Sequence, residues 1–399
     1  MRTPVIVFSL SLLLAGLAPA YDSLSIRLVG RWDSLPDYFS FGVAAQGDYA
    51  YVADFAAGLR VISVADPAHP TEVGYYDTPG HADGVAVVGN LAYVSDGDSG
   101  LRVISVADPA HPTEVGHCGT LGYAREVDVV GDYAYVAHDS GLSVISVADP
   151  AHPTEVGSYH TQYGAFGVAV AGAYAYVGNS EGLWVISISD PTQPSWVGRY
   201  ITSGMGVAVQ DSYVYVAAAS AGLRVVSVTD PANPAEVGYL LDSANSAVRL
   251  AVSGNYVHVV PGFGLASCGL RVISVADPAN PVEVGRHSLG RNCVALGGGY
   301  AYVGAGYSLA ILQFYGGGVE ENPKPQAVSV KPGPTFVRGV LTMDNGTGAS
   351  SSLGWLLDGA GRKVQALHQG ANDVSHLAPG VYFMHEAQAQ AFTKVIVAR

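Results

Sequence analysis

One unit is repeated along most of this chain, and it constrains the fold more than any other feature. A Gly-Leu-Arg-Val-Ile-Ser-Val-Ala-Asp-Pro string begins at Gly58 and returns with small changes at Gly100, Gly141, Gly182, Gly222 and Gly269. Most copies also carry a Tyr-x-Tyr-Val segment before this string and a Glu-Val-Gly segment after it, as at Tyr133 and Gly157. A period of about forty residues is typical of a chain built from one supersecondary unit.

Each copy contains four short runs that favour β-strands. In the second copy they are Val85–Val88, Ala92–Val94, Leu101–Val106 and Glu114–Gly116, and residues typical of turns separate them. Apolar residues occupy both alternation phases of the first and third runs, as expected for a sheet that is covered on both faces. We therefore predict one four-stranded antiparallel meander per copy, with the sheets stacked radially.

The number of copies predicts a closed ring. The leucine that opens the third strand occurs seven times, at Leu59, Leu101, Leu142, Leu183, Leu223, Leu270 and Leu309. The last copy ends near Tyr315 without an outer strand, whereas Leu28-Val29-Gly30 matches the outer-strand pattern and precedes every other element. We therefore expect an all-β, seven-bladed β-propeller in which residues 25–33 complete the final blade, whose other strands come from about 292–315.

The Gly-Leu-x-Val-Ile-Ser-Val-x-Asp-Pro-x-x-Pro unit resembles the LVIVD repeat, a β-propeller repeat found mainly in exported bacterial and archaeal proteins. The resemblance extends over about 26–315. It implies a secreted or cell-surface propeller, and it supplies no catalytic residues. The last copy departs from the pattern, because Tyr315-Gly316 replaces its Asp-Pro.

The first twenty residues have the pattern of an export signal. Arg2 is followed by an apolar run from Val5 to Leu17 and by the small residues Ala18-Pro19-Ala20, which suit cleavage. No later stretch reaches the roughly 20 apolar residues of a membrane span. We therefore expect residues 1–20 to be a signal peptide, residues 21–316 to form the propeller, and the protein to be secreted or held at the cell surface.

A second domain is predicted after the propeller. Residues 317–325 mix flexible Gly with stiff Pro and are interpreted as a linker. Residues 326–399 contain strand-like runs separated by Asp-Gly, Gln-Gly and Pro-Gly turns, which indicates a small β-sandwich. This region resembles the C-terminal sorting domain of the type IX secretion system at Asp358, Gly361, Lys363, Pro379, Gly380, Tyr382 and Lys394. The resemblance implies the secretion machinery as a partner.

Charge and motif content argue against several function classes. Asp and Glu number 33 against 19 Lys and Arg, a formal net charge of −14, so no basic stripe is available for nucleic-acid phosphates. Zinc-protease, P-loop and dinucleotide-binding patterns are missing from the sequence. We therefore expect a non-enzymatic protein with no cofactor, no bound metal and no nucleic-acid partner.

The residues that vary between copies mark the candidate binding site. In a propeller, the loops that lead into the inner strands and the loops between the second and third strands meet at one end of the central channel. Here the first set carries His81, Asp83, Arg125, Glu126, Arg249 and Arg291. The second set carries Asp96, Asp98, His138 and Asp139, together with Asp54 and Glu181. Variation in loops on a regular scaffold favours recognition, and we expect an extracellular protein or glycan ligand.

An enzyme is the alternative function. Scattered Asp and Glu residues from separate blades could form a carboxylate pair at the channel mouth. The protein would then be an extracellular hydrolase or lyase acting on glycans or lactones.

Other polar recurrences have a structural interpretation. The Asp-Pro-x-x-Pro segments, such as the one at Asp66, predict stable turns between the third and fourth strands. His69, His111 and His152 occupy equivalent turns of separate blades, too far apart to share a metal. Asp96–Gly100 resembles the start of a calcium loop but lacks the later acidic ligands.

Cys268 and Cys293 are predicted to lie on one face of adjacent blades. Cys268 falls in a loop between the second and third strands, and Cys293 falls at the start of the next inner strand. Because the export signal implies an oxidising environment, a disulfide between them is plausible.

Overall fold

We describe the protein from a computed structural model. The structure describes residues 25–33, 41–202, 204–241, 247–262, 269–305 and 307–315 and, beyond these, short strands within 335–397. The chain divides into two units, 1–319 and 320–399. The described residues form strands, turns and bends, and none of them belongs to a helix suited to crossing a membrane.

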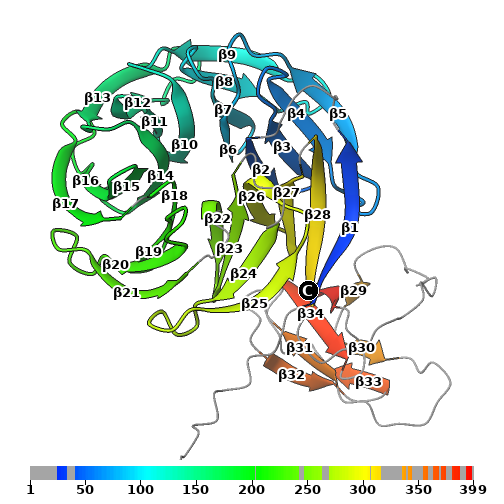
Figure 1. The fold of residues 1–399 in the computed structure, drawn as a ribbon. Helices are drawn as coiled ribbons and strands as arrows, with labels where there is room; N and C mark the ends of the chain where they lie inside the picture. The colour runs from blue at the N-terminus through cyan, green and yellow to red at the C-terminus, as the bar shows by residue number, and fades with distance from the viewer. Residues whose placement is uncertain are drawn as a thin grey trace, which may run out of the picture. The chain divides into compact units, whose positions relative to one another are not determined.

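The described part of the first unit contains seven four-stranded antiparallel sheets that follow one another around a ring, as the blades of a propeller (Figure 1). Blades one to six each use four consecutive strands, from β2–β5 to β22–β25. Blade seven combines β26, β27 and β28 with β1. The predicted all-β seven-bladed propeller is therefore confirmed.

Each position within a blade is filled by equivalent segments of the repeat. The inner strands are β2 (Gly42–Gln46), β6 (Gly84–Val88), β10 (Ala124–Val130), β14 (Ala165–Ala171), β18 (Gly206–Gln210), β22 (Ala247–Ser253) and β26 (Arg291–Gly297). The second strands are β3 (Tyr49–Ala53), β7 (Leu91–Ser95), β11 (Tyr133–His138), β15 (Tyr174–Asn179), β19 (Tyr213–Ala217), β23 (Tyr256–Pro261) and β27 (Tyr300–Gly304).

The outer half of each blade repeats in the same way. The third strands are β4 (Leu59–Ser63), β8 (Leu101–Ser105), β12 (Gly141–Ser146), β16 (Gly182–Ser187), β20 (Leu223–Ser227), β24 (Leu270–Ser274) and β28 (Ser308–Tyr315). The outer strands are β5 (Thr71–Tyr76), β9 (Thr113–Cys118), β13 (Thr154–His160), β17 (Ser195–Ile201), β21 (Ala235–Leu240), β25 (Val282–His287) and β1 (Ser25–Asp33).

The N-terminal strand closes the ring, as predicted. β1 runs antiparallel to β28, from the pair Ser25 and Tyr315 to the pair Asp33 and Ser308, with a bulge between Leu28 and Gly30. β28 would otherwise be an open sheet edge with unsatisfied backbone groups. Blade seven is therefore built from the two ends of the propeller segment.

The hydrophobic core lies between neighbouring blades. One cluster joins Tyr51 and Leu59 of blade one to Val94 and Ile104 of blade two, and equivalent clusters lie between other pairs of blades. The leucines that open the third strands are almost completely buried in all seven blades. Burying one such side chain stabilises the fold by about 1.5–3 kcal/mol.

The Glu-Val-Gly and Asp-Pro segments of neighbouring blades fit together. Asp66 accepts hydrogen bonds from the Ala68 amide (3.1 Å) and from Nδ1 of His69 (2.9 Å), which forms the predicted turn. A Cβ atom at Gly74 in β5 would lie 2.3 Å from the carbonyl oxygen of Pro109, in the equivalent turn of blade two. The glycine of each outer strand therefore allows close contact with the next blade.

The second unit also consists of strands in its described part. They are β29 (Thr335–Val337), β30 (Val340–Met343), β31 (Gly354–Leu357), β32 (Lys363–Leu367), β33 (Gly370–Asp373), β34 (Gly380–Glu386) and β35 (Phe392–Val397). Five of them form a sheet in the order β29-β35-β34-β31-β32, and β30 pairs with β33.

Candidate ligand-binding site

All seven blades contribute to one cavity at the start of the inner strands. Its volume is about 240 Å³, and we refer to it as the cup. The lining residues are Phe41, Asp83, Arg125, Phe166, Met205, Val248, Arg249, Gly262 and Asn292. Phe41, Asp83 and Met205 each lie one residue before an inner strand. The second residue of each of the other four inner strands also lines the cup: Arg125, Phe166, Val248 and Asn292. The cup is therefore the mouth of the central channel.

Glycines bring the inner strands close together below the cup. A Cβ atom at Gly84 would lie 3.0 Å from the carbonyl oxygen of Arg125 in the next blade, and one at Gly206 would lie 2.6 Å from the carbonyl oxygen of Val248 in the next blade. A side chain larger than hydrogen would therefore force neighbouring strands apart. The channel narrows at this level to a cavity of about 50 Å³.

An ion pair crosses the channel and forms the floor of the cup. Arg249 of blade six pairs through Nη1 with Oε2 of Glu126, which belongs to blade three. The same nitrogen donates a hydrogen bond to the carbonyl oxygen of Phe166 in blade four (3.2 Å). The side chains of Arg249 and Glu126 are 19% and 32% exposed, so the pair is partly shielded from water. Two predicted site residues from non-adjacent blades therefore meet.

Asp83 is the carboxyl group in the wall of the cup. It is only 8% exposed and accepts a hydrogen bond from the hydroxyl of Tyr123 (3.2 Å). Burial raises the pKa of Asp83 to about 6, although Arg249, Arg125 and the Tyr123 hydroxyl each favour the ionised form. Asp83 can therefore both donate and accept hydrogen bonds near neutral pH.

Arg125 is held in place at the rim. Its Nε and Nη2 atoms donate hydrogen bonds to Oδ1 of Asp139, at 3.0 and 2.7 Å. The guanidinium group lies 5.1 Å from the ring centre of Tyr123 and 5.3 Å from that of Phe166, within the range of cation–π contacts. Arg125 and Asp139, both predicted site residues, thus form a paired polar group beside aromatic rings.

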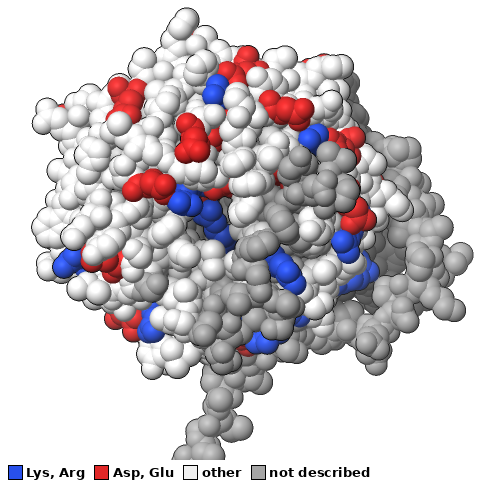
Figure 2. Space-filling model, turned by 45° about the horizontal axis from the view of Figure 1, so that its top comes forward, with Lys and Arg blue, Asp and Glu red and all other residues white. Residues whose placement is uncertain are grey.

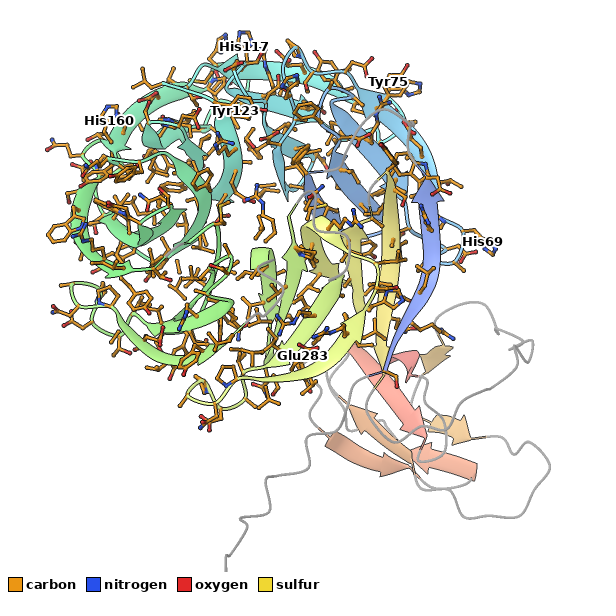
Figure 3. The ribbon with its side chains drawn as sticks, in the orientation of Figure 1. His69, Tyr75, His117, Tyr123, His160 and Glu283 are labelled. Carbon is orange, nitrogen blue, oxygen red and sulfur yellow. The ribbon has the colours of Figure 1, made fainter. Side chains whose placement is uncertain are left out.

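Aromatic rings continue around the rim of blades one to three. Phe41 packs against Phe55 with ring centres 5.2 Å apart, and Phe55 stacks on His81 at 4.0 Å with an angle of 22°. His81 Nδ1 lies 3.5 Å from the hydroxyl of Tyr123. Phe55 has a φ of 48°, which is unusual for a residue other than glycine. In Figure 3, Tyr123 lies nearer the axis of the ring than His69, Tyr75 and His117, which lie at its outer edge.

The face of the molecule in Figure 2 is hollowed near its middle. Lys and Arg atoms lie at this hollow, with Asp and Glu atoms beside them. This neighbouring placement of positive and negative side chains agrees with the ion pairs of the cup, in which Arg249 and Arg125 each have a carboxylate partner.

Asp96 and Asp98 are separated by the structure. Asp96 is completely buried and accepts hydrogen bonds from the Thr78 hydroxyl (2.5 Å) and the Gly80 amide (2.9 Å). Protein donors thus occupy both of its carboxylate oxygens, whereas Asp98 is exposed. Among the residues that the structure describes, no group of three His, Cys, Asp or Glu side chains is arranged to hold a metal ion.

His138 is also buried within its blade rather than in the cup. Its Nδ1 accepts a hydrogen bond from the Ser140 amide (3.1 Å), and its Nε2 lies 2.9 Å from Oγ of Ser143. Burial lowers the pKa of His138 to about 4, so the ring is neutral at neutral pH. Arg291 begins β26 and lies opposite Gly304.

A Gly-x-Ser-x-Gly string, Gly178–Gly182, has the spacing of a hydrolase nucleophile elbow. It forms the turn between the antiparallel strands β15 and β16, where an elbow requires a strand followed by a helix. The amides of Glu181 and Gly182 donate to Oδ1 of Asn179, at 2.9 and 3.1 Å. The string is therefore a turn motif of blade four.

Two sequence predictions fall partly outside the described residues. Cys293 is buried, and burial raises the pKa of its thiol to about 12, but Cys268 lies outside the described residues, so the disulfide stays a prediction. Of the sorting-motif residues, Lys363, Gly380, Tyr382 and Lys394 lie in strands β32, β34 and β35. Asp358, Gly361 and Pro379 lie outside the described residues.

The sequence does not single out six lining residues of the cup, most of them apolar, or one rim residue: Phe41, Phe166, Met205, Val248, Asn292, Gly262 and Tyr123. The prediction selected charged loop residues, whereas the lining residues share a position at the start of an inner strand. Each of Phe41, Asp83 and Met205 directly precedes the glycine that opens an inner strand.

Comparison with known proteins agrees with the repeat and the fold. The LVIVD repeat matches residues 40–78, 79–120, 121–161, 164–202, 203–242 and 244–288, which together exceed half of the chain. These stretches correspond to blades one to six. No curated protein matches the sequence.

Solved structures resemble the propeller in fold. One is the crystal structure of the computationally designed Ika8 protein, with 11% sequence identity and a TM-score of 0.52. The similarity covers 72% of this chain and 99% of Ika8. At this identity, the likeness concerns the fold alone.

Proposed function

The chain belongs to the LVIVD repeat family, and from that premise we propose that it is an exported, non-enzymatic binding module that captures an extracellular ligand in the cup. The observation that carries this proposal is the lining of the cup, to which all seven blades contribute. Recognition sites on regular scaffolds are commonly built from the positions at which the repeats differ.

The size of the cup supports the capture of one terminal group of a larger ligand. Its volume of about 240 Å³ is below the roughly 300–1,000 Å³ of pockets that enclose a drug-sized molecule. Its floor is closed by Arg249 and Glu126, so the ligand does not pass through the channel at this point. A single sugar unit or a single side chain fits these dimensions.

The chemistry of the cup favours a glycan over a charged peptide. Arg125 and Arg249 are each paired with a carboxylate of the protein, so no strong net charge is presented to the ligand. Phe41 and Phe166 offer apolar ring surfaces, while Asp83 and Arg125 offer hydrogen bonds. Apolar ring faces beside paired hydrogen-bonding groups match the two sides of a sugar ring.

Binding arrays of glycans and proteins test this function. We expect the mature full-length chain to retain at least one glycan, and Phe41→Ala to weaken that binding about tenfold or more, because a ring in the cup is lost. Trp196→Ala is the matched control, since Trp196 is 53% exposed on the outer strand β17 of blade four. Equal loss with both variants, or no loss with Phe41→Ala, would contradict a site in the cup.

An extracellular hydrolase or lyase acting on glycans or lactones is a second candidate, and Asp83 is the observation that favours it. A carboxyl group with a pKa of about 6 is suited to proton transfer, and the Tyr123 hydroxyl lies 3.2 Å away. Incubating the captured glycan with the wild-type protein and with Asp83→Asn distinguishes the two functions. Product formation that Asp83→Asn abolishes supports the enzyme, whereas an unchanged glycan supports the binding module.

We further propose that residues 1–20 direct export, that 317–325 link the domains, and that 326–399 form a small β-sandwich used by the type IX secretion machinery for sorting or attachment. The sheet that contains β34 and β35 and the sequence resemblance support this assignment. Locating tagged protein with and without residues 323–399 tests it. Equal arrival of both forms at the cell surface would show that the segment is not a sorting signal.

A further inference from the structure

One residue at the rim of the cup has a backbone conformation that packing between the blades does not explain. Phe55 lies in the loop between β3 and β4 and has a φ of 48°. Holding a bulky residue in this region of φ costs about 1–3 kcal/mol. Phe55 is half-buried, and the hydrophobic clusters on the two sides of blade one do not include it. The reason for a phenylalanine at this position must therefore lie at the rim itself.

Equivalent loops show that Phe55 departs from the repeat. Three loops between second and third strands form the same isolated bridge: Phe55 with Ala82, Gly97 with Ala124, and Ala219 with Ala247. Gly97 and Ala219 also have positive φ values, of 54° and 44°. Glycine adopts such values without strain, and alanine is the smallest residue with a side chain. The shape of the loop therefore does not call for a phenylalanine, and the ring needs a separate explanation.

The ring of Phe55 supports His81. The two rings are stacked, with centres 4.0 Å apart and an angle of 22° between their planes. The ring centre of Phe41, which lines the cup, lies 5.2 Å from that of Phe55. His81 is exposed despite these neighbours. Because Phe55 covers one face of the imidazole, the exposed surface of His81 belongs to its other face and its outer edge.

A second residue connects His81 to the wall of the cup. Nδ1 of His81 lies 3.5 Å from the hydroxyl of Tyr123, which donates a hydrogen bond to Oδ1 of Asp83 (3.2 Å). A Cβ atom at Gly97 would lie 2.9 Å from the Tyr123 ring, so the missing side chain at Gly97 makes room for that ring. His81 is therefore held between Phe55 and Tyr123, two residues before a lining residue of the cup.

Blade four has no side chain at the position that carries these rings. Tyr123 stands directly before Ala124, which opens β10, and His81 holds the equivalent place in blade two. In blade four, the residue before β14 is Gly164. A ligand held in the cup therefore meets aromatic rings on the side of blades one to three and no such ring at blade four.

We propose that His81 and Arg125 form a second subsite, which binds the sugar unit next to the one held in the cup, and that Phe55 positions His81 for this contact. The inference rests on the proposed function, and it names the ligand as a glycan of two or more units bound through its end. The exposed face of His81 packs on the C–H face of the second sugar ring. Arg125 uses Nε and Nη2 for Asp139, and its Nη1 donates to sugar hydroxyls.

Calorimetric titration of the mature full-length chain with single sugars and matching disaccharides tests the subsite. The probes are glucose with cellobiose, mannose with mannobiose, and N-acetylglucosamine with chitobiose. We expect at least one disaccharide to bind about tenfold more tightly than its single sugar, because a second ring is then packed. Equal affinity within every pair that binds would overturn the second subsite and leave the cup in place. Failure of every probe to bind would overturn the subsite and the proposed function together.

Replacing His81 by alanine tests the residue that packs on the second sugar. We expect His81→Ala to lower the ratio of disaccharide to single-sugar affinity from about ten to about one. His117→Ala is the matched control, because His117 is also an exposed histidine but lies on the outer strand β9, at the outer edge of the ring (Figure 3). The ratio should be unchanged in this control. A ratio that is also unchanged in His81→Ala would overturn the proposal.

The variant Phe55→Gly separates positioning of His81 from a role in the fold. Glycine occurs at the equivalent place in blade two, so the variant is expected to fold and to melt close to the wild type, because relief of strain offsets the lost ring contacts. The affinity ratio should nevertheless fall about threefold, since His81 loses the ring that holds it. Phe55→Tyr keeps the ring and should restore the ratio. A lower melting temperature with an unchanged ratio would show that Phe55 serves the fold alone.

Discussion

The channel mouth and the packing between blades differ in how far the repeats diverge. Between the blades, the same residue types recur at equivalent positions, such as the leucines that open the third strands. At the mouth, one position around the ring holds Phe41, Asp83, Arg125, Phe166, Met205, Val248 and Asn292. A side chain between blades must fit against a neighbouring sheet of the same shape, whereas a side chain at the channel mouth does not pack on such a sheet. Divergence there is therefore available for recognition.

The largest expected effect comes from removing the strand that completes the ring. Deletion of residues 25–33 leaves β28 with an open edge and exposes the apolar residues of blade seven. We expect loss of most of the roughly 5–15 kcal/mol that stabilises a folded protein, with aggregation in place of a single thermal transition. Calorimetry and size-exclusion chromatography measure this. A truncated protein that melts like the wild type would show that β1 is dispensable.

Substituting a leucine buried between blades should destabilise the protein far more than substituting an exposed leucine in a loop. Leu142 is completely buried in β12, whereas Leu121, near the channel mouth, is 56% exposed. We expect Leu142→Ala to lower the free energy of unfolding by about 2–5 kcal/mol, and Leu121→Ala to change it by less than about 0.5 kcal/mol. Denaturant titration of both variants checks the contrast. A similar loss of stability in both variants would contradict the difference proposed between the packing positions and the channel mouth.

Asp83, at the channel mouth, should lower the free energy of unfolding at neutral pH. Its pKa is 3.8 in the unfolded reference and about 6 in the fold, so the folded protein binds more protons between these values. Stability therefore falls as pH rises through this range, by up to roughly 3 kcal/mol from this group. Below pH 3.8 the carboxyl is protonated in both states and contributes nothing.

The variant Asp83→Asn isolates that contribution. We expect it to be more stable than the wild type at pH 7.5 and equally stable at about pH 3.5, because other titrating groups are shared and cancel. Thermal unfolding across this pH range provides the measurement. A difference that does not change with pH would show that Asp83 has an ordinary pKa.

The smallest effect concerns hydrogen bonds between neighbouring blades. The Tyr76 hydroxyl donates to Glu114 of the next blade (3.2 Å), while the structure gives no such bond for Tyr159 among the described residues. We expect Tyr76→Phe to cost about 1 kcal/mol and Tyr159→Phe to cost less than half of that. A cost that is the same for both would assign the effect to ring packing.

The repeat allowed most of the propeller to be predicted, because its period identifies the blade and the leucine positions count the blades. Ring closure followed from one unmatched outer strand, Leu28–Gly30, at the opposite end of the segment from the incomplete blade. The sequence alone therefore identifies the two ends as partners.

The composition of the cup was harder to predict. Glu126 and Arg249 were both candidates, but their contact across the channel depends on how closely glycines such as Gly84 and Gly206 bring the inner strands together. Asp96 directly follows β7 and His138 ends β11, yet their side chains turn into the blades, where hydrogen-bond partners are available. Side-chain direction of this kind is not encoded in the position of a residue within the repeat.

Cross-linking of β1 to β28 tests the central claim, the closed seven-bladed ring, most directly. Arg27 lies opposite Gln313, and Asp33 lies opposite Ser308. We expect Arg27→Cys with Gln313→Cys to form a disulfide on oxidation, detected by mass spectrometry of non-reduced peptides, and Arg27→Cys with Ser308→Cys to form none. A cross-link in the mismatched pair only, or in neither pair, would contradict closure of the ring by the N-terminal strand.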